Sequence, residues 1–174
     1  MSQIDFLISK IQTQDQLKKT IERWQLKGRT FVFTNGVFDI LHKGHVTLLA
    51  RAAEEADYLV LGLNSDQSVR TLGKGPDRPI NSEYDRAYIL AALSSVSAVV
   101  IFNESTPYNL IETLQPDVLL KGGDYDPNQR NKKARDYIVG SDLQLNGGRK
   151  VISIDLVDGY STTSTIKKIA DGKN

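Results

Sequence analysis

The sequence contains no cysteine among its 174 residues. Disulfide bonds, thiolate metal centres and a cysteine nucleophile are therefore excluded. It also lacks a strong excess of charge of either sign, since 22 lysines and arginines oppose 21 aspartates and glutamates, for a formal net charge of +1. No strong overall field would attract nucleic acid or an anionic membrane, so we expect neither as a partner and predict a small ligand in a local pocket.

Long hydrophobic runs are missing as well. The first residues, MSQIDFLISKIQTQDQLKK, have no uninterrupted apolar stretch of the kind that signal peptides carry. No window approaches the ~18 apolar residues that a transmembrane helix needs. We therefore expect a cytoplasmic protein. The sequence does have an ordinary globular composition, with 40% hydrophobic and 25% charged residues, and a length that suits one domain.

The apolar pattern predicts alternating strands and helices. An amphipathic helix is expected over 13–27, because Thr13 and Gln16 have capping-box spacing and Gly28 suits a helix end. The remaining elements are strands at 30–35, 58–63, 98–102, 118–121 and 151–157, and helices at about 45–56, at 82–93, from a Thr106 cap and Pro107 to before Pro116, and from 161–163 onward. This order predicts an α/β fold with a doubly wound parallel sheet, Rossmann-like, and helices on both faces.

Residues 1–28 are expected to form an N-terminal helical extension, and residues 29–174 the main domain. The charged stretch that begins at Asp126 and ends at Gly148 is harder to interpret. A helix with mobile loops over the site and a merely solvated excursion fit it about equally well.

Polar clusters follow four of the predicted strands, at 34–45, 64–66, 121–124 and 158–163. In an open α/β sheet, ligands bind beyond the carboxyl ends of the strands. One such cluster could be ordinary loop chemistry, but several on the same edge predict a binding site there.

The first cluster, TNGVFDILHKGH, contains both histidines of the chain, His42 and His45. Gly44 lies between them and would let a phosphate approach the backbone at a helix N-terminus, where free amide donors favour anions. Two alternatives remain. The histidines could simply cap the helix, or they could bind zinc, although two histidines without cysteine make an incomplete ligand set.

Several motifs together resemble a known family. TNGVFDILHKGH at 34–45, LNSD at 63–66, Arg78-Pro79, KGGDY at 121–125 and DGYSTTSTIKKI at 158–169 are similar, in matching order, to the HxGH-motif nucleotidyltransferase superfamily in its cytidylyltransferase-like branch. The likeness is strongest to the heptose 1-phosphate adenylyltransferases of lipopolysaccharide and surface-glycan synthesis. Glycerol-phosphate cytidylyltransferases share the first motif but differ at the fourth strand and before the serine–threonine run.

The resemblance implies that residues 29–174 form a nucleotidyltransferase domain. Its expected reaction transfers AMP from ATP to a sugar 1-phosphate, D-glycero-β-D-manno-heptose 1-phosphate, and releases pyrophosphate. Mg²⁺ would accompany ATP and bind mostly through phosphate oxygens, without a metal site of protein side chains. A homodimer is left open, with the N-terminal helix as its candidate face.

The expected catalytic residues are His42, His45 and Lys121, which would position the phosphates and stabilise charge at the attacked phosphorus. The nucleotide site is expected to include the same three residues and Thr34, Asn35, Gly36, Phe38, Gly44, Asp158, Ser161, Thr162 and Thr163. The substrate site is expected to include Asp39, Asn64, Asp66, Arg78, Arg86, Gly123 and Asp124.

Each of these roles has a structural alternative. Ser161 could only cap a helix, Asp39 could only shape a turn, Arg78 could be a solvated loop residue, and Arg86 could form a surface ion pair. Two other functions are also open: a cytidylyltransferase acting on glycerol 3-phosphate or a similar small phosphorylated alcohol, and a non-catalytic nucleotide-binding module. An oxidoreductase is disfavoured because no GxGxxG follows the first strand.

Overall fold

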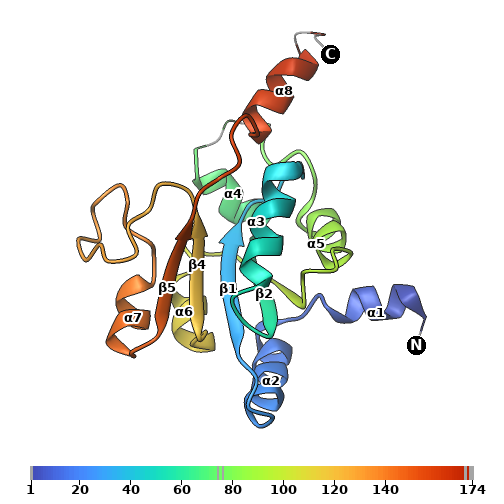
Figure 1. Ribbon diagram of the computed structural model, residues 1–174. Helices are drawn as coiled ribbons and strands as arrows, with labels where there is room; N and C mark the ends of the chain where they lie inside the picture. The colour runs from blue at the N-terminus through green and yellow to red at the C-terminus, as the bar shows by residue number, and fades with distance from the viewer. Residues whose placement is uncertain (1, 74, 76, 171, 173–174) are drawn as a thin grey trace.

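The computed structural model describes residues 2–73, 75, 77–170 and 172. Within them, five strands form one parallel sheet in the order β3-β2-β1-β4-β5 (Figure 1). The strands are β1 Phe31–Gly36, β2 Tyr58–Asn64, β3 Ala98–Phe102, β4 Val118–Gly122 and β5 Lys150–Ile154. The chain runs outward from β1 to β3 and then crosses to the other side of β1. This reversal confirms the predicted doubly wound α/β sheet.

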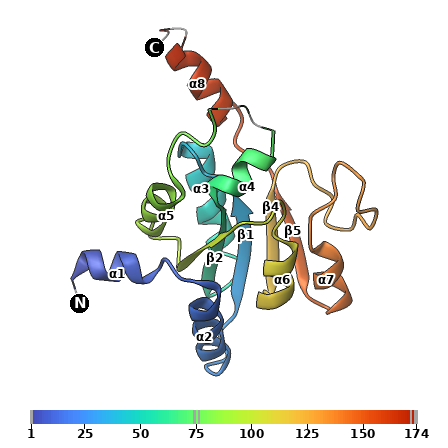
Figure 2. The same cartoon turned by 180° about the vertical axis from the view of Figure 1, so that it is seen from behind.

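Helices cover both faces of the sheet. They are α1 Gln3–Ser9, α2 Gln14–Gln25, α3 Lys43–Ala53, α4 Asp66–Thr71, α5 Glu83–Ala91, α6 Tyr108–Leu114, α7 Ser141–Asn146 and α8 Thr162–Ala170. Helices α3 and α5 lie on one face, and α2, α6 and α7 lie on the other, while α8 projects beyond the carboxyl ends of the strands (Figures 1 and 2). None of the helices in the described part of the chain is long and apolar enough to cross a membrane.

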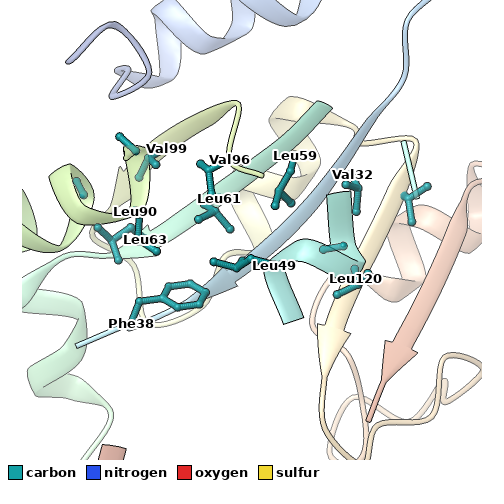
Figure 3. Close-up of a cluster of buried hydrophobic side chains, with 14 residues drawn as sticks. Val32, Phe38, Leu49, Leu59, Leu61, Leu63, Leu90, Val96, Val99 and Leu120 are labelled. Atoms are coloured by element: carbon teal, nitrogen blue, oxygen red, sulfur yellow. The ribbon is translucent and has the colours of Figure 1, made fainter. Parts of the chain in front are cut away.

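Each face of the sheet has its own hydrophobic core, because successive strand residues point to opposite sides and both sides are covered. On the α3 and α5 face, the strand residues pack against Leu49 and Leu90 (Figure 3). On the other face, Phe31, Phe33 and Phe102 pack against residues of α2 and α6.

The N-terminal segment is part of this architecture. The amide of Val99 donates to the carbonyl of Lys10 at 2.8 Å, and the amide of Gln12 donates to the carbonyl of Val99 at 2.9 Å. These bonds cover the outer edge of β3, which would otherwise present unpaired backbone groups. Leu17 and Ile21 of α2 then enter the core of the α6 face. The helix expected over 13–27 is confirmed, whereas α1 was not predicted.

Two element ends and one helix differ from the sequence expectation. Pro107 is the N-cap of α6 and makes no side-chain cap bond, so Thr106 is not the cap that was predicted. Strand β5 ends at Ile154 rather than at residue 157, because its partner β4 ends at Gly122, the residue paired with Ile154. Helix α4 was not predicted. In the stretch 126–148 the only helix is α7.

Candidate functional site

The two halves of the sheet meet at β1 and β4, and the strands separate there toward their carboxyl ends. Strand β1 pairs with β2 along its whole length, but its register with β4 covers only Val32–Val118 and Phe33–Leu119. Lys121 bridges the resulting gap. Its Nζ donates to the backbone oxygen of Asn35 at 3.3 Å and to its Oδ1 at 3.2 Å. A cation is therefore held at the switch point, where ligands of this architecture bind.

The loop after β1 leads directly into α3 and brings the two histidines together. His42 is the N-cap of α3, and its Nδ1 accepts the backbone N–H of His45 at 3.3 Å. The imidazole rings stack with centroids 3.8 Å apart, and Phe38 lies edge-on to His45 at 5.2 Å. Because Nδ1 of His42 is an acceptor, a neutral ring keeps its proton on Nε2. Burial lowers the pKa of His42 below its ordinary value, against a smaller opposing backbone hydrogen bond, which favours that neutral form.

Both histidines line a pocket of about 390 Å³, which we call the histidine pocket. Its other lining residues are Val37, Phe38, Asp39, Gly44, Arg78, Leu156, Val157, Tyr160, Ser161, Thr162 and Thr163. The N-termini of α3 and α8 both reach this pocket. Ser161 caps α8, since its Oγ accepts the amide of Ser164 at 3.0 Å. Two helix N-termini, imidazole donors and a guanidinium make the pocket suited to a multiply charged anion.

Gly44 allows close packing at the mouth of this pocket. A Cβ at this position would lie 3.1 Å from ring atoms of His42 and 3.2 Å from Cβ of Tyr160. The sequence analysis expected the missing side chain to admit a phosphate. In the structure the missing side chain makes room for the segment before α8, whose Tyr160 lies with its ring centroid 6.0 Å from that of His42.

A second pocket, of about 300 Å³, lies on the other side of the end of β1. We call it the lysine pocket, and it shares Val37 with the histidine pocket. Its other lining residues are Asn35, Gly36, Asn64, Leu72, Ser105, Thr106, Pro107, Leu119, Lys121, Tyr125, Tyr137, Ile138 and Val139. The two pockets therefore meet where β1 and β4 separate.

Asp39 anchors the loop before α5 to the loop before α3. Its carboxylate is fully buried and accepts the amides of Ile80 and Asn81 and the Nε of Arg78. Burial alone would raise the pKa of Asp39, but the amides of Asn81 and Ile80 and the Arg78 guanidinium outweigh it and lower that pKa below its ordinary value. The ionised carboxylate thus places Arg78 at the histidine pocket.

Arg86 is buried beneath the site, with a fully covered side chain. Its Nη1 donates to the carbonyls of Val37 at 2.7 Å and Asn64 at 2.9 Å, and its Nε donates to the carbonyl of Asn81 at 3.0 Å. Its Nη2 pairs with Asp66 at 2.7 Å. One guanidinium therefore ties together the carboxyl ends of β1 and β2 and the loop before α5. The guanidinium also holds the carbonyl of Val37, directly before Phe38. Phe38 has a φ of 48°, which is unfavourable for a residue with a side chain.

The structure brings together most of the residues that the sequence analysis expected at the site. The histidine pocket is lined by His42, His45, Gly44, Phe38, Asp39, Arg78 and residues 161–163, and the lysine pocket by Lys121, Asn35, Gly36 and Asn64. Thr34, Asp66, Arg86, Gly123 and Asp158 line neither of these two pockets, and Asp124 lines a separate open one with Arg135. Lys74, which precedes Arg78 by four positions in the sequence, is outside the described residues.

Aromatic residues of both pockets were missed. Tyr160 and Tyr137 lie in loops, so no periodicity marks them. Two signals were available. Tyr160 lies inside the DGYSTT motif, and Tyr137 starts an apolar trio directly after a charged stretch.

Several curated proteins are similar to this chain along most of its length. The bifunctional protein HldE of Syntrophotalea carbinolica is 52% identical over 163 residues, which cover 94% of this chain and 31% of that protein. The bifunctional protein HldE of Mesorhizobium japonicum is 52% identical over 154 residues, covering 88% of this chain and 29% of that protein. The chain thus spans about a third of the length of these curated relatives.

A solved structure, the lipopolysaccharide core biosynthesis protein from Thermoplasma volcanium, superposes with a TM-score of 0.56 at 26% identity, covering 77% of this chain and 100% of that one. Residues 33–168, which hold all five strands apart from the first residues of β1 and the whole of both pockets, match the cytidylyltransferase-like family. The chain belongs to the cytidylyltransferase-like family.

Proposed function

We propose that this chain is an adenylyltransferase that transfers AMP from ATP to D-glycero-β-D-manno-heptose 1-phosphate, giving ADP-heptose and pyrophosphate. The observation that carries the proposal is the meeting of two pockets at Val37, one rich in anion-binding groups and one holding Lys121. A triphosphate and a second phosphorylated molecule can therefore approach each other across the end of β1. Nucleotidyl transfer requires two such reactants to be held close together.

The heptose is supported by the motifs and by the relatives. The KGGDY and DGYSTTSTIKKI segments are similar to the heptose branch of the superfamily and differ from glycerol-phosphate cytidylyltransferases. The similar structure from Thermoplasma volcanium is that of a lipopolysaccharide core biosynthesis protein. ATP as the donor also fits the cytoplasmic location that we propose.

In this reaction an oxygen of the sugar phosphate attacks the α-phosphorus of ATP. A new oxygen–phosphorus bond forms while the bond from the α-phosphorus to the bridging oxygen breaks, and pyrophosphate leaves with that electron pair. The nucleophile is already an anion, so no general base is required. Catalysis comes from positioning and from donors that stabilise the charge on the equatorial oxygens of the phosphorus.

The histidine pocket is our proposed triphosphate site. The Nε2–H of neutral His42, together with His45, would donate to the phosphates. Arg78, oriented by Asp39, and the α8 N-terminus beginning with Ser161 would bind the β- and γ-phosphates. The attacking and leaving oxygens lie roughly in line, so the acceptor must approach the α-phosphorus from the side opposite the leaving pyrophosphate. We assign that side to the lysine pocket, where Lys121 would hold the acceptor phosphate.

Mg²⁺ fits this site as an ion carried by the triphosphate. Among the described residues, no group of three or more histidine, aspartate or glutamate side chains is arranged to hold a metal. Asp39, the carboxylate of the histidine pocket, already accepts hydrogen bonds from Arg78, Ile80 and Asn81. Phosphate oxygens and water would supply most ligands, as Mg²⁺ prefers, and the ion would neutralise charge on the leaving pyrophosphate.

The test is pyrophosphate release by the purified chain with ATP or CTP, each combined with heptose 1-phosphate, glycerol 3-phosphate or phosphocholine. We expect turnover with ATP and heptose 1-phosphate. Turnover with CTP and glycerol 3-phosphate alone would identify a cytidylyltransferase instead. Nucleotide binding without turnover of any pair would identify a non-catalytic module.

A further inference from the structure

We propose that Tyr137 is a specificity-determining residue, which Asp142 holds against the lysine pocket so that the pocket accepts a cyclic sugar phosphate. The inference rests on the proposed function, because it concerns the acceptor of that reaction. It assigns a role to the long charged loop between β4 and α7, which neither the motifs nor the family explains.

The loop leaves the end of β4, swings outward beside β5 and returns to α7 (Figure 1). Its exposed, charged middle lies away from the pocket. Its two ends come back to the pocket wall, with Tyr125 at the start and Tyr137, Ile138 and Val139 at the end. The side chain of Ile138 is also part of the core on the α6 face. The end of the loop is therefore fixed to the body of the protein.

Asp142 fixes the orientation of Tyr137. The Tyr137 hydroxyl donates to Asp142 Oδ1 at 2.6 Å, and the hydroxyl of Tyr108 donates to Asp142 Oδ2 at 3.2 Å. Lys132 also pairs with Oδ2 at 2.6 Å and lies 5.0 Å from the centre of the Tyr108 ring. This cluster joins α6, the loop and the first turn of α7. The Lys132 side chain is 58% exposed, so its ion pair adds little, and the tyrosine bonds carry most of the positioning.

The protonation states agree with that geometry. Burial would raise the pKa of Asp142, but hydrogen bonds from Lys132 and Tyr137 outweigh it and lower that pKa below its ordinary value. Burial, and then the bond to Asp142, raise the pKa of Tyr137 above its ordinary value. At neutral pH a neutral phenol therefore donates to a carboxylate, which is a strong, short hydrogen bond.

With its hydroxyl committed to Asp142, Tyr137 offers its ring to the pocket. Ile138 and Val139 extend that apolar wall, while Asn64 and Lys121 provide polar groups elsewhere in the lining. A cyclic sugar has the matching character, since C–H groups gather on a ring face while hydroxyls project from its edge. A short linear phosphorylated alcohol would leave the apolar wall uncovered. The wall thus selects for a ring.

The test measures kcat and KM separately for ATP and for heptose 1-phosphate in Tyr137→Phe, Tyr137→Ala and Asp142→Asn variants. Tyr88→Ala is the matched control, because Tyr88 is a tyrosine of α5 that is 41% exposed and lines neither pocket. We expect Tyr137→Ala to raise the acceptor KM by about tenfold or more and to narrow the preference for heptose 1-phosphate over glycerol 3-phosphate by a similar factor. The KM for ATP should stay within about twofold.

Tyr137→Phe and Asp142→Asn should shift the acceptor KM in the same direction but less, because each keeps the ring and loses only its orientation. They also serve if Tyr137→Ala does not fold, as judged by thermal unfolding. Suppose that the wild-type protein turns over heptose 1-phosphate. Variants with unchanged acceptor KM and selectivity, or with equal changes in KM for ATP and for the acceptor, would then overturn this inference alone. A wild-type protein with no turnover of any acceptor would overturn the proposed function as well.

Discussion

Nδ1 of His42 accepts the backbone N–H of His45 at 3.3 Å, so one imidazole caps a helix and also lines the pocket that helix points into. Capping and anion binding were alternatives for these histidines in the sequence. The geometry is compatible with both roles, because the cap bond to Nδ1 places the proton of a neutral His42 on Nε2. The two roles can be separated by substitution.

His42→Asn should separate them. Asparagine is among the best N-cap residues, so the free energy of unfolding should stay within about 0.5 kcal/mol of wild type. The imidazole donor is lost, and kcat for pyrophosphate release should fall by about 10²–10³. His42→Ala, which removes the cap too, should lose about 1 kcal/mol of stability in addition. Wild-type turnover in the asparagine variant would show that His42 is only a cap.

Gly44→Ala should weaken activity without weakening the fold. Alanine is favoured over glycine in a helix interior by about 1 kcal/mol, and this gain, smaller at the second residue of α3, opposes the cost of displacing two side chains, so the melting temperature should change by only a few degrees. The new methyl would lie 3.1 Å from the His42 ring and 3.2 Å from Tyr160, and both would have to shift. We expect kcat/KM for ATP to fall by about tenfold or more. An unchanged kcat/KM would mean that the segment before α8 tolerates the shift.

Asp39 should contribute a pH-dependent part of the stability. The pKa of Asp39 in the folded protein lies below its ordinary value. Its contribution to the free energy of unfolding is therefore complete above the pKa of the unfolded state, and it is lost as the pH falls through the pKa of the folded state. The stability difference between wild type and Asp39→Asn, from urea unfolding, should therefore shrink from about pH 5 downward. Asp77→Asn, an exposed carboxylate in the same loop, is the control and should show little change. A constant difference across that range would contradict the assignment.

Arg86→Met should destabilise the protein by about 3–5 kcal/mol in urea unfolding, because removing this buried guanidinium leaves buried carbonyls and the partly buried Asp66 without their donor. Asp66 and the carbonyls of Val37 and Asn64 lose their hydrogen bonds. Arg51→Met, on the exposed side of α3, should change stability by less than about 0.5 kcal/mol. A mild effect of Arg86→Met, with a raised KM for the acceptor, would instead favour the substrate contact that the sequence analysis expected.

Arg86 also shows which part of the site was not predictable. The strands were predictable because both faces of the sheet are buried, so that β2 and β3 are short apolar runs between polar loops. From the sequence, an arginine near the start of a helix beside a site could face the ligand or lie buried beneath the site. Arg86 lies beneath it because its guanidinium donates to the carbonyls of Val37 and Asn64. The positions of these carbonyls depend on strand ends that are distant in sequence.

The loop after β4 was unpredictable for a different reason. Its charged residues have no period, and its conformation depends on tertiary hydrogen bonds such as that from Tyr137 to Asp142. Helix α4 was missed because it is short and lies within a connection rich in turn-forming residues. Short-range pattern carries little information where long-range contacts determine the local structure.

The boundary expected at residue 28 leads to the last prediction. We propose that α2, although it precedes the first strand, is required for the stability of the domain that follows. Leu17 is completely buried against residues of β1, β3 and α6, whereas Leu26, at the end of the same helix, is 87% exposed. Leu17→Ala should therefore cost about 2–5 kcal/mol in urea unfolding, and Leu26→Ala less than about 0.5 kcal/mol.

A single cooperative transition should persist in both variants, because α2 shares one core with the sheet. If Leu17→Ala instead produced an early transition confined to the N-terminal helices, with the midpoint of the main transition unchanged, residues 1–28 would be an independent extension. Hydrogen exchange distinguishes these outcomes directly. The amide of Val99, which donates to the Lys10 carbonyl, and the amide of Gln12, which donates to the Val99 carbonyl, would lose protection together with α2 in the first case and would keep most of it in the second.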